Sequence, residues 1–270
     1  MVTFPNGKIN LGLNIVNKRT DGYHDIETIF YPIKLNDAIE VIKKNNIHFS
    51  VTGLAIDGDQ ENNLSIKAFH LLKKDFPQLP PIHLHLHKTI PLGAGLGGGS
   101  ADGAFTLKLL NKKFDLGLSE KQLVEYSLQL GSDCPFFISN KPCFATGRGE
   151  MLEQIDLDLS QFKIVIVHPG VHVSTAWAFS TIKPGAPKKS IKEISKQPIE
   201  TWKQELKNDF EEPVFNKYPE IKKIKDDLYT AGAIYSSMSG SGSAVYGYFE
   251  KDKPLSLSFP RNYFLKELGN

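Results

Sequence analysis

The chain has 270 residues, of which 40% are hydrophobic and 23% charged. This balance is typical of a folded globular protein, so we do not expect a disordered chain. Its 32 basic and 30 acidic residues give a net charge of +2, which argues against a nucleic-acid partner, because nucleic-acid-binding proteins concentrate a basic excess on one face.

Residues 1–8 show no basic region followed by an apolar stretch, so we expect no signal peptide. No apolar run approaches the ~20 residues that cross a bilayer, so we expect no membrane partner. The two cysteines, Cys134 and Cys143, lack the spacing of a metal site. A cytoplasmic location is the expectation that follows.

The first third of the chain predicts strands. Apolar and polar or small residues alternate over 9–15, the period of a half-buried strand, and residues 39–42 and 48–51 predict two more. Residues 63–74 instead carry apolar side chains at helical spacing.

The segment 82–87 alternates isoleucine or leucine with histidine. A metal site is one interpretation of the three histidines. However, side chains on one face of a flat strand lie roughly 7 Å apart, which is too wide for adjacent ligands of one zinc ion. We favour an amphipathic strand with its leucines directed inward.

The later elements follow a mixed order. A helix is predicted over about 100–111, and a second opens at Ser119, where Gln122 completes a capping box. Residues 163–167 and 244–249 predict strands, and the charged region 188–225 predicts exposed helices. Because strands and helices follow no regular βαβ rhythm, the predicted fold class is α+β.

The strongest local signal is the glycine-rich loop that precedes the first of these helices. Five glycines in seven positions remove the Cβ atoms that keep a ligand away from the backbone. The loop enters a helix whose first N–H groups carry the positive end of the dipole, with Ser100 as the predicted N-cap. We therefore predict that phosphate binds at Pro91, Leu92, Gly93, Ala94, Gly95, Leu96, Gly97, Gly98, Gly99, Ser100 and Ala101.

Other interpretations of the loop fit less well. It contains the dinucleotide pattern G-x-G-x-x-G at Gly93, Gly95 and Gly98, but Pro91 precedes it and no acid follows at the expected strand end. The Walker A Gly-Lys-Ser/Thr and the H-R-D and D-F-G motifs of protein kinases are absent from the sequence. A flexible linker would rarely join an alternating strand to an amphipathic helix.

Three segments together resemble the GHMP kinases: the strand at 8–11, the glycine loop, and the turn at 237–244. The resemblance implies a ribosomal-protein-S5-like N-terminal domain over 1–155 and a ferredoxin-like C-terminal domain over 156–270. It also implies ATP and Mg²⁺ as cofactors. Ser100 is then the candidate Mg²⁺ contact.

Three further stretches, 19–28, 131–137 and 168–179, are similar to the members of this family that phosphorylate the 2-hydroxyl of 4-diphosphocytidyl-2-C-methyl-D-erythritol, in the non-mevalonate route to isoprenoids. By itself Asp133 would be a turn or cap residue. The resemblance makes it the group that accepts the hydroxyl proton, with Lys8 stabilising charge. It also implies substrate contacts at Asn10, Tyr23, His24, Thr175 and Phe179, an adenine contact at Asn63, and a motif near the phosphates at Gly240, Ser241 and Gly242.

Three alternatives remain open from the sequence. A GHMP kinase for a sugar, homoserine or mevalonate would lack the segment at 21–24. A dinucleotide-dependent oxidoreductase would bind NAD(P)H. A non-catalytic nucleotide-binding module would bind ATP without turnover.

Overall fold

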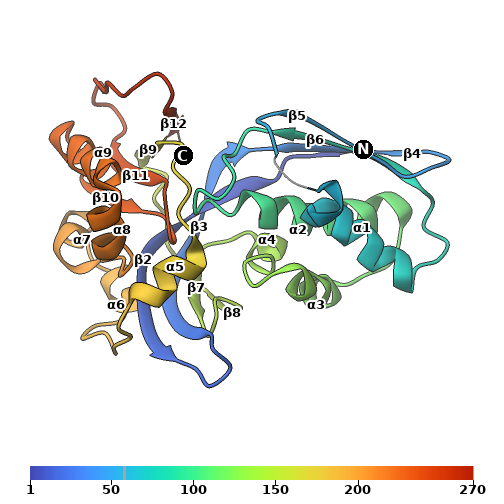
Figure 1. The fold of residues 1–270 in the computed structure, drawn as a ribbon, viewed down its shortest axis with the longest axis horizontal. Coiled ribbons are helices and arrows are strands. Elements are labelled where there is room, and N and C mark those ends of the chain that lie inside the picture. Colours follow the sequence, from blue (N-terminus) through green and yellow to red (C-terminus); the bar gives the residue numbers. More distant parts are fainter. Residues whose placement is uncertain (57–58, 270) are drawn as a thin grey trace. The chain divides into compact units, whose positions relative to one another are not determined.

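The computed structural model describes residues 1–56 and 59–269, and its mixed strands and helices confirm the α+β class (Figure 1). The chain divides into two compact units. Unit 1 comprises Met1–Gly7, Leu35–Leu92 and Gly97–Lys141, and unit 2 comprises Lys8–Lys34, Gly93–Leu96 and the chain from Pro142 onward. The division into 1–155 and 156–270 stays a prediction. The units interleave along the chain, because strands from the N-terminal region share a sheet with strands after Pro142.

Unit 1 is built around a sheet in the strand order β1-β4-β6-β5. Figure 1 shows helices α1 and α2 lying along one face of this sheet. The elements are β1 (Val2–Thr3), β4 (Ala38–Lys43), β5 (His48–Gly53), η1 (Gln60–Asn62), α1 (Leu64–Asp75), β6 (Ile82–Lys88), α2 (Gly98–Phe114), α3 (Glu120–Leu130) and α4 (Phe136–Ser139).

Strand β6 has the two-faced character that its sequence predicts. Leu84 and Leu86 are fully buried, while His83 and His85 are half-buried on the opposite face. The hydroxyl of Ser50 on β5 lies 2.8 Å from Nε2 of His83 and 2.8 Å from Nδ1 of His85. The histidines therefore hold the parallel pair β5–β6 together from its outer face.

The predicted helix starts are confirmed for α1 and α3. The Asn63 side chain accepts the N–H of Ser65, and Ser119 forms a capping box with Gln122. Such caps satisfy N–H groups that the helix itself leaves unpaired. None of the helices within residues 1–56 and 59–269 combines the length and apolarity that a bilayer crossing requires.

Unit 2 contains two sheets, with strand orders β2-β3-β7-β8 and β10-β11-β9-β12. Helix α9 packs on β10 and β11. The elements are β2 (Asn6–Lys18), β3 (His24–Asn36), β7 (Cys143–Thr146), β8 (Met151–Gln154), β9 (Phe162–His168), α5 (Thr175–Thr181), α6 (Ile191–Ile194), α7 (Ile199–Glu205), α8 (Glu211–Lys217), α9 (Pro219–Thr230), β10 (Tyr235–Met238), β11 (Val245–Glu250) and β12 (Phe264–Gly269).

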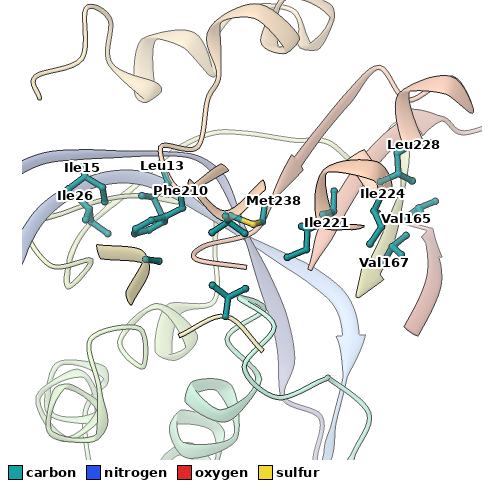
Figure 2. Packing of buried hydrophobic residues seen from close by; sticks show 14 of the residues in the cluster. Leu13, Ile15, Ile26, Val165, Val167, Phe210, Ile221, Ile224, Leu228 and Met238 are labelled. Atoms are coloured by element: carbon teal, nitrogen blue, oxygen red, sulfur yellow. The ribbon is translucent and has the colours of Figure 1, made fainter. Parts of the chain in front are cut away.

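The core of unit 2 joins both of its sheets (Figure 2). Leu13 and Ile15 of β2 belong to the same buried cluster as Val165 and Val167 of β9. The central residues of strand β9, 164–167, are apolar and fully buried, and the strand pairs with β11 on one side and β12 on the other. Phe210 lies in this cluster and contacts the ring of Phe179 edge-on, with centroids 4.9 Å apart. The cluster thus supports an aromatic side chain of the predicted substrate site.

His168, at the end of β9, makes stability sensitive to acid. Burial lowers the pKa of His168 below its ordinary value of 6.5, because the imidazolium loses hydration. As pH falls, His168 therefore takes up a proton in the unfolded chain before it does so in the folded chain. Its contribution to the free energy of unfolding is present in full above its ordinary pKa and is lost as pH falls below that value.

We expect denaturant melts to show a free energy of unfolding that falls between about pH 7 and about pH 5, and less steeply in His168→Gln. His87→Gln, which changes an exposed histidine of β6, is the control. An equal slope in wild type and His168→Gln would contradict the assignment.

Candidate functional site

In unit 1, the end of the glycine loop leads into α2 without a side-chain cap. The helix begins at Gly98, so the prediction of Ser100 as N-cap is wrong, and Ser100 is the third helical residue. Gly97 is the N-cap in the left-handed conformation, with φ of 69°, and no side chain in the described part of the chain caps this end. A glycine there is favoured because side chains are strained at this φ. The first N–H groups of α2 are thereby available to an anion.

A cavity of about 540 Å³ lies in unit 1 beside this helix end. Phe49 and Val51 of β5 supply apolar wall, and Asn63 supplies an amide. The cavity also reaches Gly99, where an added Cβ would meet no atom within 4 Å. The lining also includes the polar side chains of Asp59, Gln60 and Asn62. Apolar wall with hydrogen-bonding groups suits a planar base, and the open space at Gly99 suits its phosphates.

Asp133 lies in the turn between α3 and α4, as its sequence context predicts. Next to it, burial raises the pKa of the Cys134 thiol to about 12, while a hydrogen bond to Ser100 opposes that shift and the charge of Asp133 adds to it. The thiol therefore stays neutral. Ser100 and Asp133 were predicted from separate motifs, and both interact with the side chain of Cys134.

In unit 2, Lys8 is buried on β2 with only 4% of its surface exposed. Its Nζ donates to Oδ1 of Asn10 at 2.6 Å and lies 4.7 Å from the centroid of the Phe30 ring. Nδ2 of Asn10 in turn donates to the Thr28 hydroxyl at 3.0 Å. Lys8 and Asn10 share one face of the strand, as the strand period predicts.

The loop segment Gly93–Leu96 packs against the turn at 239–244, also within unit 2. The Ser239 hydroxyl donates to the Gly95 carbonyl at 2.7 Å, and the Ala244 N–H donates to the Ala94 carbonyl at 3.0 Å. A Cβ on Gly95 would lie 2.0 Å from the Ser239 carbonyl oxygen, so the contact requires glycine. Gly240 and Gly242, with φ of 57° and 94°, shape the turn between them.

Thr175 and the aromatic residues of the predicted substrate site lie in unit 2 as well. The hydroxyls of Thr175 and Ser241 are 3.0 Å apart. The rings of His24 and Phe179 stack with centroids 4.9 Å apart and an interplanar angle of 18°. Tyr23, which is 57% exposed, does not join that stack.

Sequence reasoning missed Arg148, which lies over Tyr23. Its guanidinium carbon is 5.0 Å from the centroid of the Tyr23 ring. Asp21 accepts the N–H of Tyr23 at 3.1 Å and so fixes the backbone of that turn. The signal for Arg148 was its position between Gly147 and Gly149, both at positive φ, in the turn joining β7 to β8.

Comparisons with known proteins agree with this architecture. The family model described as GHMP kinases N terminal domain matches residues 63–141, and GHMP kinases C terminal matches residues 190–257. The 4-diphosphocytidyl-2-C-methyl-D-erythritol kinase of Bacteroides fragilis is 53% identical over 95% of this chain and 94% of its own. The enzyme of the same name from Parabacteroides distasonis is 52% identical over 93% of this chain and 92% of its own.

Solved structures are similar over the same span. A crystal structure of 4-(cytidine 5'-diphospho)-2C-methyl-D-erythritol kinase is 28% identical and superposes with a TM-score of 0.82 over 100% of both chains. A mevalonate kinase, at 14% identity and a TM-score of 0.71 over 100% of both chains, shares the fold alone. By identity over nearly its whole length and by both family models, this chain belongs to the GHMP kinases.

Proposed function

We propose that the chain transfers the γ-phosphate of ATP to the 2-hydroxyl of 4-diphosphocytidyl-2-C-methyl-D-erythritol. The observation that carries the proposal is the 53% identity, over 95% of the chain, to a kinase named for this substrate. Membership of the GHMP kinases supports ATP as the phosphoryl donor. The stacked rings of His24 and Phe179 and the separate, exposed ring of Tyr23, all in unit 2, support a substrate that carries a pyrimidine.

The donor residues lie around α2. In the proposal, the glycine loop from Pro91 to Ala101 holds the triphosphate with backbone N–H groups, and Asn63 contacts the adenine. The absence of a side-chain cap on α2 within the described residues fits an anion at that end. Ser100 presents a half-buried hydroxyl in the first turn, which fits a Mg²⁺ ligand. When bound, Mg²⁺ neutralises charge on the phosphate oxygens.

The acceptor residues have separate roles. Asp133 takes the proton from the attacking hydroxyl, and Lys8 stabilises negative charge on the transferring group. Asn10 is held by Lys8 and Thr28, so that its amide is oriented for the substrate. Thr175 contacts Ser241 in the Gly240–Gly242 turn, and Ser239, just before that turn, donates to the Gly95 carbonyl of the loop segment.

The test is a coupled ADP-release assay with the cytidyl substrate beside galactose, homoserine and mevalonate. We expect turnover with the cytidyl compound alone. Turnover with another acceptor would replace the substrate assignment, and binding of NAD(P)H without binding of ATP would overturn the kinase assignment.

Tyr23→Ala is expected to raise KM for the cytidyl substrate far more than KM for ATP. Stacking on an aromatic ring contributes ~1–3 kcal/mol per base, equivalent to about 5- to 150-fold in KM. Tyr23→Phe, which keeps the ring, is the matched control. Equal increases in both KM values would contradict a base-stacking role for Tyr23.

Arg148→Met is expected to show the same selectivity with a smaller effect, because it removes the cation over Tyr23 and leaves the ring. Arg261→Met, which changes another exposed arginine of unit 2, is its control. If Arg148→Met leaves the cytidyl KM unchanged, Arg148 has no part in the substrate site.

A further inference from the structure

A buried group of three charges lies in unit 1, outside the roles given above. Lys88 ends β6, Asp37 precedes β4, and Asp102 lies in α2, and each is at most 2% exposed. Nζ of Lys88 donates to Oδ2 of Asp37 and, at 2.8 Å, to Oδ2 of Asp102. Buried charges lose hydration, so a cluster of this kind is often no more stable than apolar residues of the same volume. Stability alone therefore does not account for this group, and its hydrogen-bond geometry matters as well.

The group fixes the entry to the glycine loop. Oδ1 of Asp37 accepts the N–H of Thr89 at 2.5 Å and the N–H of Ile90 at 2.8 Å. These two residues connect β6 to Pro91, where the loop begins. One carboxylate thus holds both the Lys88 ammonium and the backbone that leads to the loop.

The same ammonium fixes the exit of the loop. Asp102 lies one turn after the start of α2, and its carboxylate accepts from Lys88. Nζ of Lys88 and Cγ2 of Ile90 each lie 2.9 Å from the place where a Cβ on Gly98 would be, so a side chain there would displace one of them. Lys88 therefore contacts the first turn of α2, the same turn whose second residue, Gly99, lines the cavity.

Asp102 has a feature that stability alone does not explain. Its Oδ1 is buried and has no hydrogen-bond partner within the residues that the structure describes. An asparagine would present the same acceptor to Lys88 without a second buried negative charge. The amide nitrogen of that asparagine would, however, occupy the buried position of Oδ1, where it would have no acceptor among the described residues. Burial raises the pKa of the Asp102 carboxyl to about 7, and the nearby charge of Lys88 opposes that shift.

We propose that Lys88, with Asp37 and Asp102, is a positioning residue for the phosphoryl donor: it locks the first turn of α2 to the end of β6, so that the N–H groups of α2 and the nucleotide cavity keep one geometry. The inference rests on the proposed function in placing ATP at α2. A buried ammonium suits this role because it has three directed donors, whereas an apolar side chain of equal length fills the space without fixing orientation.

The test is Lys88→Met, with Kd for ADP measured by calorimetry and KM measured for both substrates. We expect Kd for ADP and KM for ATP to rise about 10- to 100-fold, with KM for the cytidyl substrate nearly unchanged. Lys163→Met is the matched control, because Lys163 is also buried, on β9, and donates to the Lys253 carbonyl.

If Lys88→Met does not fold, a triple variant tests the proposal instead. Lys88→Met with Asp37→Asn and Asp102→Asn leaves no unpaired charge buried, so it should fold and still bind ADP weakly. If that variant folds and binds ADP with the wild-type Kd, the group is structural only and the inference is wrong. Wild-type protein that binds no ADP would overturn the proposed function together with this inference. Wild type that binds ADP but does not phosphorylate the cytidyl compound would overturn the substrate assignment, and the ADP measurements would still decide the role of Lys88.

Discussion

Asp133→Asn is expected to lower kcat by about 100-fold or more, because asparagine keeps the shape of the side chain but cannot take the hydroxyl proton. Both KM values should change little, since the residues proposed to hold ATP and the cytosine are unaltered. The measurement is steady-state kinetics with the cytidyl substrate, accompanied by thermal melts with and without ligands.

Asp158→Asn is the matched control for this substitution. Asp158 is also a turn aspartate, and its carboxylate accepts the N–H of Ser160 at 2.8 Å. We expect this variant to keep the wild-type kcat. If Asp133→Asn instead melts early and retains near-normal kcat, Asp133 is a turn residue and takes no part in proton transfer.

Gly97→Val is expected to weaken ATP binding strongly, because the N-cap of α2 has a φ of 69° that a β-branched residue avoids. Moving the first turn would break backbone hydrogen bonds to phosphate. Each bond to a charged group contributes about 1.5–3 kcal/mol, equivalent to about 10- to 150-fold in Kd. Calorimetry with ATP and, separately, with the cytidyl substrate should show a loss for ATP alone.

Gly99→Ala tests whether phosphate approaches the backbone of this loop without disturbing how the loop folds. An added Cβ at Gly99 meets no protein atom within 4 Å, and the residue is helical, so the variant should fold normally. If phosphate approaches the backbone there, the methyl group should still weaken ATP binding. Gly185→Ala, whose Cβ would also meet nothing within 4 Å, should bind ATP as wild type does. Normal ATP binding by Gly99→Ala would exclude close phosphate approach at that residue.

Local patterns predicted the elements whose structure depends on near neighbours. The alternation over 82–87 gave the two faces of β6, and Ser119 with Gln122 gave the start of α3. Glycine content alone identified the loop at 93–99. These features follow from side-chain period, capping geometry and the missing Cβ, all of which act within a few residues.

Strand β3 was not predicted, although it runs over His24–Asn36. It is buried because it lies between β2 and β7, and β7 begins more than a hundred residues later in the chain. The start of α2 was placed at Ser100 because serine is a common N-cap, whereas the left-handed backbone at Gly97 begins the helix three residues earlier than that cap would. In both cases the chain's conformation depends on contacts or dihedral angles that residue type does not specify.

The sequence by itself therefore predicted the α+β class and the family, and both are confirmed, because the motifs that indicate them are short runs of neighbouring residues. The phosphate-binding role of the glycine loop and the roles of the site residues stay predictions. Tertiary structure alone decided that Arg148 covers Tyr23 and that Lys88 joins Asp37 to Asp102. Asp37 and Lys88 are separated by 51 positions, and no periodicity links them. Charged residues so far apart in the sequence become partners only in the folded chain, where they are buried together. A buried charge is tolerated only where another side chain pairs with it.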